Sequence, residues 1–393
     1  MERIGIYGGS FNPPHTGHMQ AADCARKALQ LDRLLLIPAG IAPHKLPPKG
    51  SPAALQRLEM TRIAPRHYPG FAVSDLEIRR EGPSYTYLTI RQLRKEHPDA
   101  QLYFLMGTDM FLSFLNWKEP ESIWKDAILG VFCRGEAGEK EKIQEQRARL
   151  EAMGARVELV ENPVIPISST QIRRMLVMRC ADPFLPDGVG QYIREHGLYG
   201  TAECYCDLPM DRLEQVVISL LKPSRVTHVL GCRDTAVELA RRWGADETDA
   251  ARAGILHDIT KALDGPLQLT LCGEYGMMLN DFSFHNPKTL HALTGSLVAE
   301  RIFGENPAVV QAIRNHTTGA PGMSLLDKII YVADYMEPNR DFPGVEELRR
   351  LAFTDIDAAL KLGLEMTIQM LVEQGREVCA ESRAALDWLN ERK

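Results

Sequence analysis

The sequence GGSFNPPHTGH, residues 8–18, follows an apolar run and leads into a segment with helical periodicity from Thr16 to Leu29. A second apolar run, RLLLIPA at 33–39, comes directly after that segment. Two apolar runs separated by a helix predict a βαβ unit, in which two parallel strands flank the helix. We therefore expect His15 and His18 to lie where the first strand passes into the first helix.

The spacing of the apolar residues differs between the two halves of the chain. Short apolar runs at 101–107, 127–133 and 155–161 alternate with helical segments, which predicts a parallel sheet with helices on both faces. After about residue 209 the apolar residues keep helical spacing throughout. We expect an α/β Rossmann-like domain over residues 1–200 and an all-α domain over residues 209–393.

Composition excludes several classes of protein. The net charge is −6, so the surface is not built to coat nucleic acid. Eight cysteines without a CxxC pair indicate neither a disulfide framework nor a zinc ribbon, and no run reaches the ~20 apolar residues of a membrane span. We expect a cytoplasmic protein that binds neither nucleic acid nor membrane and is free to form a homo-oligomer.

The glycine-rich turn lacks the usual phosphate-binding fingerprints, because GGSFNP is not GxGxxG and no Lys-Ser or Lys-Thr follows it. His15 and His18 share one face of the first helical turn and can donate hydrogen bonds to phosphates. One histidine near a helix start is more often a cap or an exposed residue. A second helix start, ISSTQIR at 167–173, places Arg173 beside free N–H groups and predicts another anion site.

Together, GSFNPPHTGH and ISSTQIR resemble the two signatures of the nucleotidyltransferases related to class I aminoacyl-tRNA synthetases. The resemblance implies adenylyl transfer from ATP, with Mg²⁺ on the ATP phosphates. It implies that the catalytic donors are His15, His18, Lys45 and Arg173. It places these residues around ATP: Gly8, Gly9, Ser10, Phe11, Gly107, Asp109, Ile167, Ser168, Ser169 and Thr170.

Three further stretches, IPAGIAPHK at 37–45, GPSYTYLTI at 82–90 and GTDMFLSFLNWK at 107–118, resemble bacterial nicotinate-nucleotide adenylyltransferases. The resemblance implies that nicotinate mononucleotide is the acceptor and that four residues contact it: Ser84, Tyr85, Thr86 and Trp117. From composition alone Trp117 is equally expected to be a core aromatic residue. Nicotinamide mononucleotide is the alternative acceptor. Asn12 stands where the family more often has Asp.

The second half carries its own cluster of potential ligands on separate helical segments: His228, His257, Asp258, His291, His316 and Asp334. Histidines with carboxylates and no thiolates favour first-row transition metals, and six ligands exceed the needs of one ion. We expect two ions bridged by Asp258. Such a pair activates water at neutral pH and clamps a phosphate.

The order H…HD…H…H…D resembles the HD-domain phosphohydrolases. With ILHDITK, AIRNHTTG and VADYMEPNR, the second half resembles the HD family that hydrolyses diadenosine tetraphosphate to two ADP at a centre of two metal ions, expected to be iron. Lys261, three residues after Asp258, is expected to bind substrate phosphate. Arg340 is either a second phosphate ligand or a surface residue. The alternatives are another nucleotide substrate, or a non-catalytic nucleotide sensor.

Overall fold

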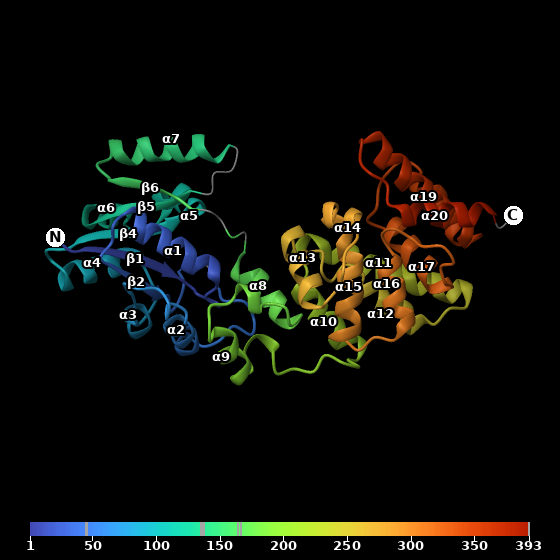
Figure 1. Ribbon diagram of the computed structural model, residues 1–393, viewed down its shortest axis with the longest axis horizontal. Coiled ribbons are helices and arrows are strands. Elements are labelled where there is room, and N and C mark those ends of the chain that lie inside the picture. The colour runs from blue at the N-terminus through green and yellow to red at the C-terminus, as the bar shows by residue number, and fades with distance from the viewer. Residues whose placement is uncertain (44–45, 134–137, 163–164, 166, 392–393) are drawn as a thin grey trace. The chain divides into compact units, whose positions relative to one another are not determined.

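The computed structural model describes residues 1–391 apart from 44–45, 134–137, 163–164 and 166. Figure 1 shows two compact units, residues 1–203 and 204–393. In the described part of the chain, no helix combines the length and the apolar character needed to cross a membrane.

The first unit is built on a six-stranded sheet of order β3-β2-β1-β4-β5-β6, and every neighbouring pair is parallel. This confirms the predicted parallel sheet. The strands are β1 (Arg3–Gly9), β2 (Arg33–Pro38), β3 (Phe71–Val73), β4 (Gln101–Gly107), β5 (Ala127–Cys133) and β6 (Val157–Glu161). The sequence did not predict β3, because three residues are too short to show a period.

The sheet is covered on both faces. One face packs alternate strand residues, among them Ile4, Ile6 and Phe104, against Ile90 of α4 and Ile143 of α7 in a common core. The opposite face meets the end of α1, because a Cβ added at Gly130 would lie 2.6 Å from Leu105 and 3.3 Å from Leu29. Helices on both faces leave the ends of the strands as the open part of the sheet.

The helices of this unit follow the expected alternation with strands. Their bounds are α1 (Thr16–Ala28), α2 (Ala54–Ile63), α3 (Leu76–Arg79), α4 (Thr86–Glu96), α5 (Thr108–Leu112), α6 (Pro120–Asp126), α7 (Glu139–Ala152), α8 (Ser169–Val177) and α9 (Val189–Glu195). Three 3₁₀ turns complete it: η1 (Phe114–Asn116), η2 (Asp182–Phe184) and η3 (Leu198–Gly200).

The second unit is all-α, as predicted: its described regular elements are helices, joined by turns and loops (Figure 1). Its helices are α10 (Met210–Leu220), α11 (Pro223–Trp243), α12 (Glu247–Leu256), α13 (Gly265–Glu274), α14 (Asp281–His285), α15 (Leu290–Arg301), α16 (Pro307–Asn315), α17 (Leu325–Met336), α18 (Val345–Ala352), α19 (Ile356–Glu373) and α20 (Ala380–Glu391), with the 3₁₀ turn η4 (Pro287–Thr289). Side-chain caps from Asp246, Asn306 and Ser324 start α12, α16 and α17.

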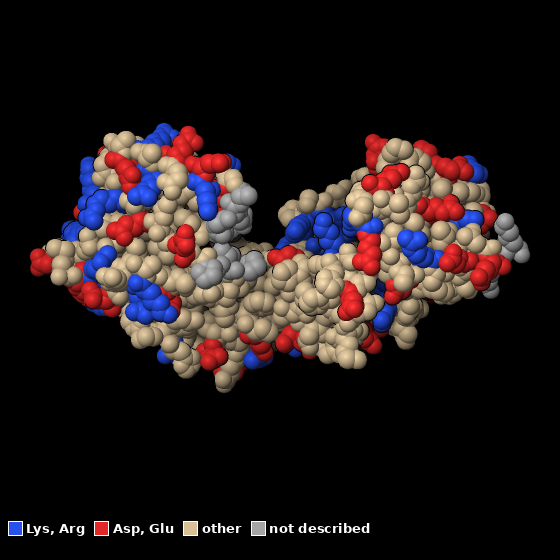
Figure 2. Space-filling view, turned by 45° about the horizontal axis from the view of Figure 1, so that its top comes forward, with Lys and Arg blue, Asp and Glu red and all other residues tan. Residues whose placement is uncertain are grey.

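The two units carry mixed surface charge. Figure 2 shows acidic and basic side chains interspersed over the face in view, with one compact group of Lys and Arg on the helical unit. This pattern agrees with the modest net charge of −6 and concentrates positive charge locally.

Candidate active sites

The first site lies at the point where the order of the strands in the sheet reverses. The chain leaves β1 to build β2 and β3 on one side, and it returns to the other side of β1 with β4. In parallel α/β sheets, ligands bind outside the carboxyl ends of the strands at such a switch point. Gly8 and Gly9 end β1 and Gly107 ends β4, and all three line one open cavity of about 360 Å³.

The two histidines of the opening motif stack at the start of α1. Their ring centroids are 3.6 Å apart, and the main-chain N–H of His15 donates to Nδ1 of His18 over 3.3 Å. Burial, with His18 adding to it, lowers the pKa of His15 to about 2, and burial lowers the pKa of His18 to about 4. Both rings are therefore neutral at pH 7. Because Nδ1 of His18 accepts, its proton is on Nε2, where it can be donated to a ligand.

The second motif is hydrogen-bonded to the first. Ser169 Oγ donates to the carbonyl oxygen of Pro13 over 3.0 Å, and Arg173 Nη1 donates to that of Asn12 over 2.7 Å. Ser168 caps α8 by accepting from the Gln171 N–H, and the Gln171 side chain accepts from the Ser168 N–H over 2.9 Å. The starts of α1 and α8 thus lie together, an arrangement that suits the binding of an anion.

A second cavity of about 420 Å³ lies beside this region and is lined by Ser10, Asn12, Ser168, Ser169, Thr170 and Arg173, among others. The first cavity is lined by Gly8, Gly9, Ser10, Ser84, Tyr85, Thr86, Gly107 and Trp117, among others. Ser10 is common to both cavities. The predicted acceptor residues therefore line the first cavity together with Gly8, Gly9 and Gly107, and the ATP residues of the second motif line the second cavity.

Of the residues predicted around ATP or as catalytic donors, Phe11, Asp109 and Ile167 line neither cavity, and Lys45 lies outside the described residues. Phe11 is buried beneath the motif, with its ring centroid 5.2 Å from that of His18. Asp109 is exposed and lines neither cavity. Ile167 packs near Gly17, where an added Cβ would lie 3.2 Å from it. Lys45 lies outside the described residues.

Two basic residues of this site were missed by sequence reasoning. Arg57 of α2 is buried and donates to the carbonyl oxygens of Ser10 and Ala39, both over 2.7 Å. Lys118 lines the first cavity, with Nζ 4.4 Å from the centre of the Tyr85 ring. Lys118 directly follows Trp117, a predicted acceptor residue, and this position could have pointed to it. Arg57 stands in an ordinary helical pattern that gives no such signal.

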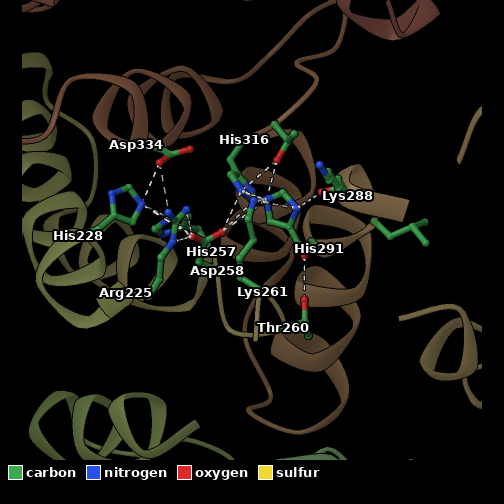
Figure 3. Close-up of polar contacts among 12 residues, drawn as sticks. Arg225, His228, His257, Asp258, Thr260, Lys261, Lys288, His291, His316 and Asp334 are labelled. Atoms are coloured by element: carbon green, nitrogen blue, oxygen red, sulfur yellow. Dashed lines mark hydrogen bonds and ion pairs between the residues drawn. The ribbon is translucent and has the colours of Figure 1, made fainter. Parts of the chain in front are cut away.

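The second site gathers all six predicted ligands from the helical unit. His228 lies on α11 and Asp334 on α17, His257 and His316 end α12 and α16, and His291 begins α15. Their side chains point toward one another in Figure 3 and form two overlapping groups, each with ligand atoms within 4.8 Å of one another: His228, His257 and Asp334, and His257, Asp258 and His316. All but Asp334 are buried.

Asp258 lies between two groups of histidines (Figure 3). Its Oδ2 is 3.6 Å from Nε2 of His257 and 3.7 Å from that of His228. Its Oδ1 is 3.4 Å from Nε2 of His291 and 3.9 Å from that of His316. Asp334 Oδ1 joins the first group, 3.0 Å from Nε2 of His228. One carboxylate thus faces two separate sets of ring nitrogens.

Each histidine is held through its other ring nitrogen. Nδ1 lies near the carbonyl oxygen three residues earlier in His257 (2.7 Å), His291 (2.8 Å) and His316 (2.6 Å). Nδ1 of His228 lies 3.1 Å from the buried Glu337 carboxylate. A ring that donates from Nδ1 presents the Nε2 lone pair, which is the form that binds metal.

Burial lowers the pKa of His257, lowers that of His291 well below its usual value and lowers that of His316 to about 4. These rings are neutral at pH 7 and available as ligands. Oδ1 of Asp258 is buried and accepts no hydrogen bond from any described residue. A buried carboxylate oxygen among neutral imidazoles suits a transition-metal ion, so the residues present fit the implied pair of ions.

Three cations surround the carboxylates. Arg225 pairs with Oδ2 of Asp258, Arg340 donates to Oδ1 of Asp334 over 2.7 Å, and Lys261 Nζ lies 3.8 Å from Oδ1 of Asp258 and 2.8 Å from Nε2 of His291. Arg225 was missed by the sequence reasoning. It lies three residues before His228, which was the available signal.

Two family models match this chain, one in each half. The model of the cytidylyltransferase-like family matches residues 6–175, and the HD-domain model matches residues 225–339. A structure described as a predicted HD superfamily hydrolase involved in NAD metabolism, from Clostridium acetobutylicum, is 38% identical with a TM-score of 0.46, over 47% of this chain and 99% of that one.

Two curated relatives match different halves of the chain. A probable nicotinate-nucleotide adenylyltransferase of Thermomicrobium roseum is 42% identical over 204 residues, which are 52% of this chain and 94% of that protein. A symmetrical bis(5′-nucleosyl)-tetraphosphatase of Bacillus subtilis is 39% identical over 170 residues, which are 43% of this chain and 91% of that protein. The chain therefore belongs to the cytidylyltransferase-like family of nicotinate-nucleotide adenylyltransferases in its first half and to the HD-domain family of symmetrical bis(5′-nucleosyl)-tetraphosphatases in its second.

Proposed function

We propose that the first unit transfers the adenylyl group of ATP to nicotinate mononucleotide, forming deamido-NAD and pyrophosphate. The observation that carries this proposal is the joining of the two helix starts, in which Ser169 and Arg173 bond to the carbonyls of Pro13 and Asn12. Two helix N-termini directed to one region supply the positive potential that a triphosphate needs.

The reaction needs no nucleophile from the protein. A phosphate oxygen of the acceptor attacks the α-phosphorus, and the bond from that phosphorus to the bridging oxygen of pyrophosphate breaks. His15, His18 and Arg173 donate hydrogen bonds to the oxygens on which negative charge grows, and Lys45 is proposed to join them. Mg²⁺ bound with ATP would neutralise phosphate charge.

The acceptor is proposed to occupy the 360 Å³ cavity. Tyr85 and Trp117 offer aromatic faces for the pyridine ring, and Thr86 begins α4, whose positive end favours a carboxylate. The Lys118 ammonium beside Tyr85 adds a second positive charge to that of the α4 N-terminus. These features favour nicotinate over nicotinamide, and the name of the T. roseum relative supports the same choice.

We propose that the HD unit hydrolyses diadenosine tetraphosphate symmetrically to two ADP. Four histidines with Asp258 and Asp334 would hold two transition-metal ions, iron being our expectation, and the bound ions would supply a water of lowered pKa. Water oxygen bonds to one of the two central phosphorus atoms, and the bridge between these atoms breaks. With ions on the carboxylates, Arg225, Lys261 and Arg340 are left to bind the polyphosphate.

The support for this substrate is the excess of cationic groups at the site and the name of the B. subtilis relative. Three cations surround two carboxylates, which suits a substrate with several negative charges. Another nucleotide, or nucleotide sensing without hydrolysis, is the alternative. A nucleotide sensor would not need the buried set of six predicted metal ligands, because sensing requires no activated water.

Chromatography of the products tests both activities in the intact protein. We expect deamido-NAD from ATP with nicotinate mononucleotide, and only ADP from diadenosine tetraphosphate, the latter lost after chelation and restored by a transition metal but not by Mg²⁺. His18→Ala should abolish the transfer and leave the hydrolysis unchanged, since His18 belongs to the first unit only. A better yield with nicotinamide mononucleotide, or an intact tetraphosphate in the presence of metal, would overturn the corresponding half.

A further inference from the structure

The four histidines of the proposed metal centre are held in two different ways. His257, His291 and His316 lie at helix ends, and their Nδ1 atoms face carbonyl oxygens of their own chain segment, three residues earlier. Carbonyl oxygens at the end of an α-helix, or in the 3₁₀ turn before α15, do not accept the regular hydrogen bond from the N–H four residues later. These three rings therefore need no other residue to set the proton on Nδ1.

His228 has no such carbonyl. It lies inside α11, Pro223–Trp243, where the carbonyls of the preceding turn are taken by the helix. Its Nδ1 instead lies 3.1 Å from Oε1 of Glu337, which is 109 residues later and only 1% exposed. On the other side of the ring, Nε2 lies 3.0 Å from Oδ1 of Asp334.

The Glu337 carboxylate is itself held in one orientation. Its Oε2 accepts two hydrogen bonds from Asn339, one from the main-chain N–H and one from Nδ2, each over 2.8 Å. Gly231, one turn after His228 on α11, makes room for this oxygen, because a Cβ there would overlap Oε2 and lie 3.1 Å from Nδ2 of Asn339. Oε1 is thereby left directed at His228.

We propose that Glu337 is a positioning residue that holds the proton of His228 on Nδ1 and keeps the Nε2 lone pair directed at the metal centre. A carboxylate only accepts, so a ring that binds an ion through Nε2 donates from Nδ1 to Glu337. This proposal rests on the proposed metal centre. It accounts for a buried acidic side chain that the hydrolysis itself does not use.

The sharpest test is Glu337→Gln, which keeps the shape of the side chain. The two donors of Asn339 require an oxygen, so the carbonyl of the introduced amide must turn to them and its NH₂ group must face Nδ1 of His228. The ring then accepts at Nδ1 and carries its proton on Nε2, which cannot bind metal. We expect Co²⁺ to bind roughly 10- to 100-fold more weakly, with a changed visible absorption spectrum and unchanged circular dichroism.

A second variant approaches the same carboxylate from α11. Gly231→Ala should raise the helical propensity of α11 but displace Oε2 of Glu337, so Co²⁺ affinity should fall without a lower Tm. Gly273→Ala is the matched control, because Gly273 is also helical and an added Cβ meets nothing within 4 Å. It should bind Co²⁺ like the natural protein.

The outcomes separate the two proposals. If the natural protein binds no Co²⁺, the metal centre itself is wrong. If it binds Co²⁺ and Glu337→Gln does so with the same affinity and spectrum, the centre stands and the role of Glu337 is refuted. Should Glu337→Gln fail to fold, Gly231→Ala decides: unchanged affinity refutes the role, and weaker binding in a folded protein supports it.

Discussion

Arg173 donates a hydrogen bond of 2.7 Å to the main-chain oxygen of Asn12, a residue 161 positions earlier in the chain. The same guanidinium donates from Nη2 to Thr170 Oγ1 over 3.0 Å. One side chain therefore ties the loop before α1 to the start of α8. Burial lowers the pKa of Arg173, so a phosphate that approaches it meets a partly desolvated cation.

Arg173→Lys should lower the rate of adenylyl transfer by about 100-fold, because an ammonium cannot hold Asn12, Thr170 and a phosphate in fixed directions. Pyrophosphate release measures the rate. Arg179→Lys is the control, since Arg179 is exposed and bonds only to the Glu203 carbonyl among the described contacts. A rate for Arg173→Lys within about twofold of the natural protein would show that the guanidinium has no part in transfer.

The HD unit allows metal binding and substrate binding to be separated. Asp258→Ala should lose both metal and hydrolysis, because the carboxylate that faces both sets of ring nitrogens is gone. Lys261→Ala should keep nearly all of its metal and lose affinity for diadenosine tetraphosphate, as its Nζ is placed to bind phosphate. Elemental analysis beside steady-state kinetics distinguishes the variants. Two ions per chain and normal turnover in Asp258→Ala would refute the bridged centre.

Lys118→Met tests the acceptor cavity. The ammonium lies 4.4 Å from the Tyr85 ring centre, beside the space proposed for the pyridine carboxylate. We expect the KM for nicotinate mononucleotide to rise about tenfold and the KM for ATP to change little, a loss of roughly 1.4 kcal/mol of binding. Lys125→Met, at an exposed lysine of α6, is the control. Equal changes for both substrates would argue against a local electrostatic role.

The first unit should lose stability on acidification. The His18 pKa falls from 6.5 to about 4 on folding, so the unfolded chain binds the proton more strongly. The stabilising contribution is complete above pH 6.5 and is lost as the pH falls toward 4; between pH 7 and pH 5 the loss is about 2 kcal/mol. Hydrogen exchange of peptides from residues 1–203, corrected for the intrinsic rate at each pH, measures this change.

His18→Asn should flatten that pH dependence, whereas His97→Asn, at the end of α4, should leave it as it is. If the natural protein and His18→Asn lose protection in parallel between pH 7 and pH 5, the neutral histidine pair is not the cause of the acid sensitivity.

The sequence predicted what depends on local pattern. Apolar runs placed β1, β2, β4, β5 and β6, and helical spacing identified the second unit, because each signal lies within one element. The motif residues His15, His18 and Arg173 were identified in the same way, as residues at helix starts.

Contacts between distant segments could not be read from the chain. Arg57 stands in an ordinary helical pattern and Lys118 follows Trp117, but the sequence does not show that they contact Ser10 and Tyr85, which are distant along the chain. Glu337 lies in the conspicuous stretch MEPN, but its role depends on His228, 109 residues away. Phe11 shows the opposite case, since a residue inside the motif turned its ring into the core.

The anchoring of all four histidines of the proposed metal centre through Nδ1 has a consequence for how metal ions would bind there. The four rings are oriented by Gly254, Lys288, Ile313 and Glu337, none of which is a proposed metal ligand. We expect these contacts to keep the rings in place without metal, so chelation should leave the circular dichroism spectrum intact, unlike in small zinc domains that unfold without metal. We therefore expect the distances between the histidine Nε2 atoms, and not folding coupled to metal binding, to determine which metal ion binds.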